Sequence, residues 1–165
     1  MEKNSYKVRM IAYTAMVAAA YVVITLMIAP LGYGVVQVRI SEALVLLAFV
    51  DKRYAPGLIL GCFIANCFSP FGLIDMVFGT ACSAAAMVGI TRFSKTLFGA
   101  SLWSVFCNAF IGVELYFLGV LGDHSLVMGM LSVAAGQFLS VSVIGYVVFR
   151  QIMKNGALVE RLRIA

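Results

Sequence analysis

The chain has 165 residues, of which 63% are hydrophobic and 12% are charged, and its mean hydropathy is +1.04. A soluble domain of this length could not bury that much apolar surface, so the composition indicates an integral membrane protein whose exterior faces the lipid bilayer. The net charge of +5 does not indicate a protein that binds nucleic acid, because the basic residues form no stripe and are not interleaved with aromatic residues.

The N-terminal segment is predicted to be a spanning helix rather than a cleaved signal peptide. A basic region ends at Arg9, and an apolar run follows it as far as Pro30. That run is too long for the core of a signal peptide and ends without a small-residue cleavage site.

A helix that crosses a hydrocarbon core about 30 Å thick needs roughly 20 apolar residues. The apolar segments are separated by polar, glycine or proline residues and cover residues 8–29, 36–50, 54–68, 71–90, 100–118 and 126–149. The second segment offers only residues 40–50 between Arg39 and Asp51, about 16 Å of helix, which is too short to cross alone. No linker is long enough for a soluble module. The sequence therefore predicts an all-α membrane protein in which residues 1–165 form a single domain, a compact bundle of six transmembrane helices.

The distribution of Lys and Arg predicts the orientation of this bundle. If the segments alternate in direction, all but one of the 12 basic residues fall on one side. These residues are Lys3, Lys7, Arg9, Lys52, Arg53, Arg92, Lys95, Arg150, Lys154, Arg161 and Arg163. The other side holds Arg39. By the positive-inside rule, both termini are expected on the cytoplasmic side.

Polar residues of five of the six expected helices are predicted to gather in the outer half of the membrane. They are Arg39, Glu42, Asn66, Asp75, Asn108, Glu114 and Gln137. Ionisable groups at membrane depth are energetically costly and by default mark function. The turn around Pro70 also leaves backbone groups unpaired, and these need a protected polar cavity. The sequence thus predicts a substrate-binding pocket near the outer face.

Most of these residues also have a structural interpretation. Arg39 and Glu42 are three residues apart and could pair on one helix face. Asn66 and Asn108 could join helices by hydrogen bonds, and Asp75 could interact with the N-terminal dipole of its helix. Glu114 is harder to explain in this way, because its own helix carries no basic residue.

Small residues repeat at four-residue spacing on several expected helices. Gly57, Gly61 and Ala65 follow this pattern, which favours close packing between helices. Ala15 and Ala19 follow it on the first helix. For that helix the pattern is compatible either with packing inside the bundle or with docking of another membrane protein.

Several sequence motifs of catalysis are missing. The chain has no G-x-x-x-x-G-K-[ST] loop, so it cannot bind and hydrolyse ATP by that route. It has no H-E-x-x-H or G-x-S-x-G motif either. The four cysteines lie inside apolar segments without a C-x-x-C pair, and the chain has one histidine. We expect buried apolar cysteines, no metal site and no cofactor, and any pumping would take its energy from another subunit or an ion gradient.

Three stretches of the chain resemble the QueT family of queuosine-precursor transporters. They are V-Q-V-R-I-S-E-A-L at 36–44, G-C-F-I-A-N at 61–66 and S-P-F-G-L-I-D-M-V-F-G-T at 69–80. The resemblance implies a six-helix substrate-binding S component of an energy-coupling factor (ECF) transporter in the bacterial cell membrane. Such a component would capture a 7-deazaguanine-type small molecule, a queuosine precursor or queuine, from outside. It would act with a transmembrane T subunit, which an A-x-x-x-A motif at Ala15 and Ala19 would contact, and with two cytoplasmic ATPase subunits.

Under this hypothesis Glu114 and Asp75 recognise a guanine-like edge or an attached amine, because carboxylates accept hydrogen bonds from such N–H groups. Asn66, Asn108 and Gln137 would add hydrogen bonds, and Arg39 would orient Glu42. Two other classes remain open. The first is a carrier for another small solute such as a vitamin, which a binding assay would distinguish. The second is a membrane enzyme that uses a carboxylate as acid or base and turns its ligand over.

Overall fold

The computed structural model describes residues 2–32, 37–122 and 125–163, and the regular structure in these residues is entirely helical. The elements are α1 (Glu2–Met27), α2 (Ala29–Gly32), η1 (Ile40–Leu46), α3 (Leu47–Val50), η2 (Lys52–Tyr54), α4 (Ala55–Asn66), α5 (Leu73–Phe93), α6 (Leu97–Ala109), α7 (Ile111–Phe117), α8 (Leu126–Gln137), η3 (Phe138–Gly145), α9 (Tyr146–Lys154) and α10 (Gly156–Leu162). η1 and η2 are 3-10 helices, and η3 is a π-helix. The prediction of an all-α fold is confirmed for this part of the chain.

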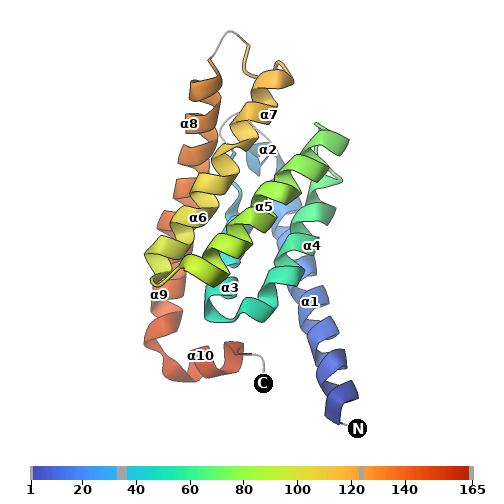
Figure 1. Cartoon of the computed structure of the whole chain (residues 1–165), viewed down its shortest axis with the longest axis vertical. Helices are drawn as coiled ribbons and strands as arrows, with labels where there is room; N and C mark the ends of the chain where they lie inside the picture. Colours follow the sequence, from blue (N-terminus) through green and yellow to red (C-terminus); the bar gives the residue numbers. More distant parts are fainter. Residues whose placement is uncertain (1, 33–36, 123–124, 164–165) are drawn as a thin grey trace.

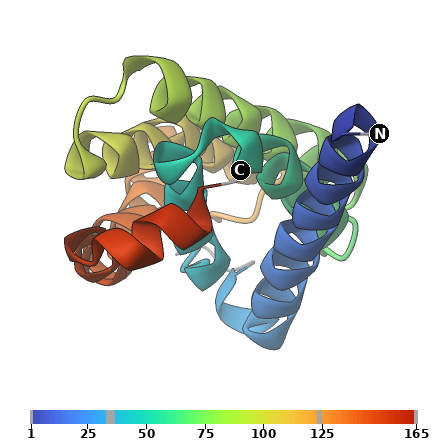
Figure 2. The ribbon, with the colours of Figure 1, turned by 90° about the horizontal axis from the view of Figure 1, so that it is seen from below.

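The long helices run up and down one common axis, and both ends of the chain lie at the same end of the molecule (Figure 1). We call this the terminal end and the opposite one the far end. The segment of η1 and α3 is interior, because it contacts α1, α6, η3 and α5. Seen from the terminal end, this segment lies between α1 on one side and α9 and α10 on the other (Figure 2).

Among the described residues, four helices are long and apolar enough to cross a membrane: Tyr6–Met27, Leu73–Phe93, Leu97–Phe117 and Leu126–Lys154. They correspond to the first, fourth, fifth and sixth expected spans, so the chain has the make-up of a multi-pass membrane protein. The other two are shorter. η1 has 7 residues and α3 has 4, so together they are about 20 Å long, and α4 with its 12 residues is about 18 Å long. The count of six membrane-spanning helices therefore stays a prediction.

The second expected span begins later than the sequence pattern indicated. Of its expected first residues, Val36 lies outside the described residues, and residues 37–39 have no helical structure. Arg39 is extended, with φ −100° and ψ 96°, and the helix starts after it at Ile40. The first span also differs, because α1 ends at Met27 and Pro30 lies inside the short helix α2, where a proline in the first turn is tolerated.

The contact between α1 and α4 depends on the small residues of α4. A methyl group on Gly61 would lie 2.8 Å from the Tyr21 Cβ atom, and one on Gly57 would lie 2.8 Å from the Thr14 carbonyl oxygen. The two backbones therefore approach too closely for any side chain at these positions. This confirms the packing that the four-residue spacing predicted. It also fixes which face of α1 looks into the bundle.

Basic residues lie toward the terminal end at the start of α1, in η2, and in α9 and α10. Arg53, beside the start of α4, donates hydrogen bonds to both carboxylate oxygens of Asp51, with an Nη2–Oδ2 distance of 2.7 Å. These hydrogen bonds raise the pKa of Arg53 above its ordinary value. The sequence pattern did not predict α10, which lies across this end (Figure 1). The Tyr54 hydroxyl holds it by donating to the Leu162 carbonyl oxygen at 2.7 Å.

Candidate functional site

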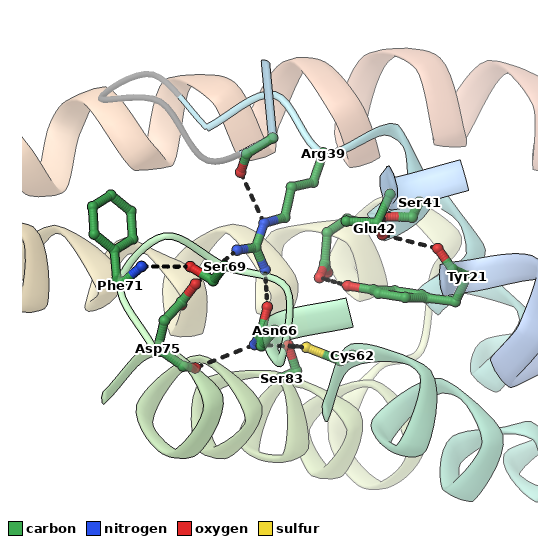
Figure 3. Close-up of polar contacts among 12 residues, drawn as sticks. Tyr21, Arg39, Ser41, Glu42, Cys62, Asn66, Ser69, Phe71, Asp75 and Ser83 are labelled. Carbon is green, nitrogen blue, oxygen red and sulfur yellow. Dashed lines mark hydrogen bonds and ion pairs between the residues drawn. The ribbon is translucent and has the colours of Figure 1, made fainter. Parts of the chain in front are cut away.

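A buried arginine ties together three separate parts of the chain. The Arg39 side chain, 1% exposed, donates to the Gly32 carbonyl at 3.0 Å and to the Asn66 Oδ1 atom at 2.9 Å. Its Nη2 atom lies 3.4 Å from Asp75 Oδ2 in an ion pair that is fully buried. Asn66 completes the network, because its amide donates to the Asp75 carbonyl oxygen at 3.3 Å. Figure 3 shows the guanidinium group pointing at both partners.

The hydrogen bonds of Arg39 to Gly32, Asn66 and Asp75 differ from the expected pairing with Glu42 on one helix face, and the role of Arg39 in orienting Glu42 stays a prediction. The difference in pairing has a local cause. Residues three apart share a face only inside a helix, and Arg39 is an extended residue that precedes the helix. Its side chain therefore leaves in another direction and meets α4 and the first turn of α5.

Glu42 is held by a second network, which begins on α1. Its Oε1 atom accepts a hydrogen bond from the Tyr21 hydroxyl. Its Oε2 atom accepts from Ser104 and from the Asn108 amide, each at 3.3 Å. One helical turn beyond Tyr21, the Thr25 hydroxyl lies 2.6 Å from the Ser41 hydroxyl. Hydroxyl groups of α1 thus contact the first turn of η1 twice. Figure 3 shows the contact of Tyr21 with Glu42.

A glycine in α5 leaves the space that the Arg39 network occupies. A methyl group on Gly79 would lie 2.8 Å from the Asn66 Nδ2 atom and 2.8 Å from the Asp75 Oδ1 atom. Both side chains would have to move to admit it. Gly136 plays a similar part on α8, since a methyl group there would lie 2.5 Å from the Gln37 carbonyl oxygen.

All seven polar residues predicted for the pocket are buried, with Glu114 the most exposed at 5%. The structure joins Arg39, Asn66 and Asp75 in one network, and Glu42 and Asn108 in the other. Glu114 and Gln137 belong to neither network through any hydrogen bond between the described residues.

Several buried polar atoms in this region have no hydrogen-bond partner among the residues that the structure describes. They are both amide atoms of Gln37, Asp75 Oδ1, Thr80 Oγ1, Asn108 Oδ1, both carboxylate oxygens of Glu114, and both amide atoms of Gln137. Nearly all buried polar groups of folded proteins have a partner, because leaving one without costs about 1–3 kcal/mol. Such a concentration is typical of a site whose partner is a ligand.

Two of these residues sit at irregular backbone. Gln37 lies in the extended segment before η1 and is fully buried. Gln137 is the last residue of α8, immediately before the π-helix η3. Short π-helical stretches inside α-helices are frequent at functional sites. Irregular backbone at membrane depth is tolerated where it is buried in protein or lines a cavity.

The sequence pattern missed Tyr21, Thr25, Gln37 and Ser104. A usable signal existed for Gln37, since it is an amide in an otherwise apolar stretch and stands two residues before Arg39. Hydroxyl residues such as Tyr21 and Ser104 are common in apolar helices, so sequence alone gives no reason to select these two. Ala15 and Ala19, which the sequence predicted as docking residues, are both exposed on α1.

Comparison with known proteins identifies the family. The model of the QueT transporter family matches residues 11–154. A curated relative, the "Queuosine precursor transporter QueT" of Lactococcus lactis subsp. cremoris (strain MG1363), is 39% identical over 67 residues. That alignment spans 39% of this chain and 39% of the relative, so the chain covers well under two thirds of that protein's length. No solved structure matches the chain. The family match covers most of the sequence, and the chain therefore belongs to the QueT transporter family.

Proposed function

We propose that this chain is the substrate-capture component of an ECF-type importer and binds a queuosine precursor, a 7-deazaguanine derivative, from outside the cell. Membership of the QueT transporter family and the name of the curated relative support this substrate class. The absence of a phosphate-binding loop in the sequence supports a division of labour in which ATP is hydrolysed by other subunits.

The observation that carries the proposal is the set of buried polar atoms without partners. Acceptors dominate it: Asp75, Asn108 and Glu114 contribute carboxylate or amide oxygens. A guanine-like ring presents the complement, since its ring N–H and exocyclic amine can donate to both oxygens of one carboxylate. The amide nitrogens of Gln37 and Gln137 supply donors for a ring carbonyl or ring nitrogen.

The two hydrogen-bond networks have a supporting role in this proposal. Arg39 is engaged with Asn66 and Asp75, so its charge offsets one carboxylate and fixes that carboxylate in place. Glu42 is engaged on both oxygens and positions Asn108. The ligand would then be recognised by the buried polar atoms that have no partner among the described residues, with Glu114 as the principal acceptor.

The orientation and the partners belong to the same proposal. The termini lie at one end of the molecule (Figure 1), with the basic residues at the start of α1, in η2 and in α10, and the positive-inside rule would place this end in the cytoplasm. The binding residues would then face outward, with residues 1–165 forming one six-helix binding domain in the bacterial plasma membrane. The exposed Ala15 and Ala19 would contact the T subunit, and two cytoplasmic ATPase subunits would drive uptake.

The test is equilibrium binding to the purified protein in lipid nanodiscs, with a panel of 7-deazaguanines, guanine and common vitamins. We expect tight binding of a 7-deazaguanine and none of the vitamins. Binding of a vitamin instead would refute the 7-deazaguanine assignment and indicate that the protein carries that vitamin. Binding of no compound by folded protein would refute the assignment of a small-molecule site of this class.

A further inference from the structure

Glu114 lines a hollow on the lateral surface of the bundle, between α5 and α7. The hollow has a volume of about 340 Å³. Its lining residues are Ile74, Phe78, Val113, Glu114, Phe117 and Leu118. We call it the Glu114 hollow. Both helices contribute from their parts near the far end, where α5 begins and α7 ends (Figure 1).

The hollow has apolar residues at its rim and the carboxyl group of Glu114 at its base. Phe117 is 79% exposed and Ile74 52%, so the rim faces whatever surrounds the bundle, whereas Glu114 is 5% exposed. Neither Glu114 carboxylate oxygen has a hydrogen-bond partner among the described residues. A carboxyl group in apolar surroundings takes up a proton unless donors satisfy its charge, and even the neutral group costs free energy there without hydrogen-bond partners. The lipid chains that would cover this surface have no donors to offer.

A second hollow on the surface of the bundle allows a comparison of lining residues. It is lined by Gly99, Leu102, Trp103 and Phe106, with a volume of about 400 Å³. It is of similar size, yet none of its lining residues is charged. A lipid chain can fill it without leaving a polar group unsatisfied. The Glu114 hollow is different, and lipid alone does not account for its carboxylate.

The hollow also adjoins the Arg39 network. Ile74 in its rim precedes Asp75 in the first turn of α5. Asp75 is the carboxylate that forms the buried ion pair with Arg39. Asp75 Oδ1 is the other carboxylate oxygen without a hydrogen-bond partner among the described residues.

From these observations we propose that the Glu114 hollow is the side of the binding site at which a planar aromatic ring with neighbouring N–H donors enters and is held. This rests on the proposed function and adds where the ligand binds. The ring edge donates to the Glu114 carboxylate, as two parallel N–H groups can. The ring faces meet the side chains of Phe78 and Phe117 in the offset or edge-on arrangements that aromatic groups prefer. A volume of this size is within the range of small-molecule sites.

The test compares two variants in which the same large side chain, tryptophan, is introduced into one hollow or the other. Val113→Trp fills the Glu114 hollow, and Leu102→Trp fills the apolar hollow and serves as the matched control. Both proteins are titrated calorimetrically in nanodiscs with 7-deazaguanine and guanine as probes, together with Glu114→Gln, which preserves shape but removes the charge. Ile74→Trp, at a half-exposed rim position, is the second filling variant in case Val113→Trp does not fold.

We expect Val113→Trp or Ile74→Trp, and also Glu114→Gln, to weaken binding about tenfold or more, with Leu102→Trp close to wild type. Wild-type affinity in a folded filling variant would overturn the inference and leave the hollow as a lipid contact, with the proposed function intact. Equal losses in Leu102→Trp would overturn it as well, because the effect would not be local. If wild-type protein binds neither probe nor any 7-deazaguanine of the panel, the proposed function itself fails.

Discussion

The buried ion pair of Arg39 and Asp75 gives the most stringent test of how this bundle is stabilised. Arg39→Met keeps much of the side-chain volume but removes the cation from a carboxylate that is 0% exposed. It also takes a donor from Asn66 Oδ1 and from the Gly32 carbonyl. Removing one member of a buried pair typically costs about 3–5 kcal/mol, because the other charge is left uncompensated. We expect a loss of unfolding free energy in that range.

The double variant separates the charge effect from packing. In Arg39→Met/Asp75→Asn the stranded charge is gone, so we expect the double variant to be more stable than Arg39→Met alone. The coupling free energy between the two sites should be about 1–3 kcal/mol. Unfolding can be followed by SDS titration in mixed micelles, using fluorescence of the single tryptophan, Trp103.

The control is the pair at the terminal end. Arg53 and Asp51 are closer, at 2.7 Å, but the Arg53 side chain is 31% exposed. Solvent screens such a pair, so Arg53→Met should change the unfolding transition very little despite the shorter distance. The reasoning would be refuted if Arg53→Met destabilised the protein as much as Arg39→Met, or if the effects at positions 39 and 75 were simply additive.

Three further predictions concern α1. Gly61→Ala should lower the unfolding free energy by about 1–3 kcal/mol through overpacking against α1; Gly156→Ala, with no neighbouring atom within 4 Å, should not, and equal effects would contradict the close approach. Tyr21→Phe should cost about 1–3 kcal/mol in the same titration, because the buried carboxyl group of Glu42 loses a hydrogen-bond donor; an unchanged transition would show that its other donors suffice. Ala15→Trp should leave ligand binding intact and abolish uptake by cells, and surviving uptake would remove this face of α1 as the docking surface.

Periodicity and composition predicted the long helices because lipid solvation imposes a simple rule on them. A segment of about 20 apolar residues can satisfy its backbone only as a helix, so Leu73–Phe93 and Leu126–Lys154 were located nearly correctly. The same rule is weaker where a segment is short. η1 is shielded by neighbouring helices and takes 3-10 geometry, and nothing in its residues specifies that.

Burial of the polar residues was predictable, whereas their partners were not. Each costly residue in an apolar segment must be sheltered, and all seven are. The pairing of these side chains depends on the backbone conformation of one or two residues. The extended Arg39 directs its side chain to α4 and α5, and Glu42 is left to Tyr21 on α1. Contacts between residues 21 and 42, or 39 and 75, are decided by tertiary packing that a single sequence does not encode as a pattern.

The unpartnered atoms connect stability with function in this protein. At about 1–3 kcal/mol for each buried group without a partner, residues such as Glu114 and Gln137 lower the stability of the empty protein. A ligand that supplies their partners recovers that free energy on binding, and it stabilises the fold by mass action as its concentration exceeds the dissociation constant. Residues that only joined helices would be satisfied in the empty bundle, as Asn66 is. The residues left open are therefore the ones at which the identity of the ligand should matter most.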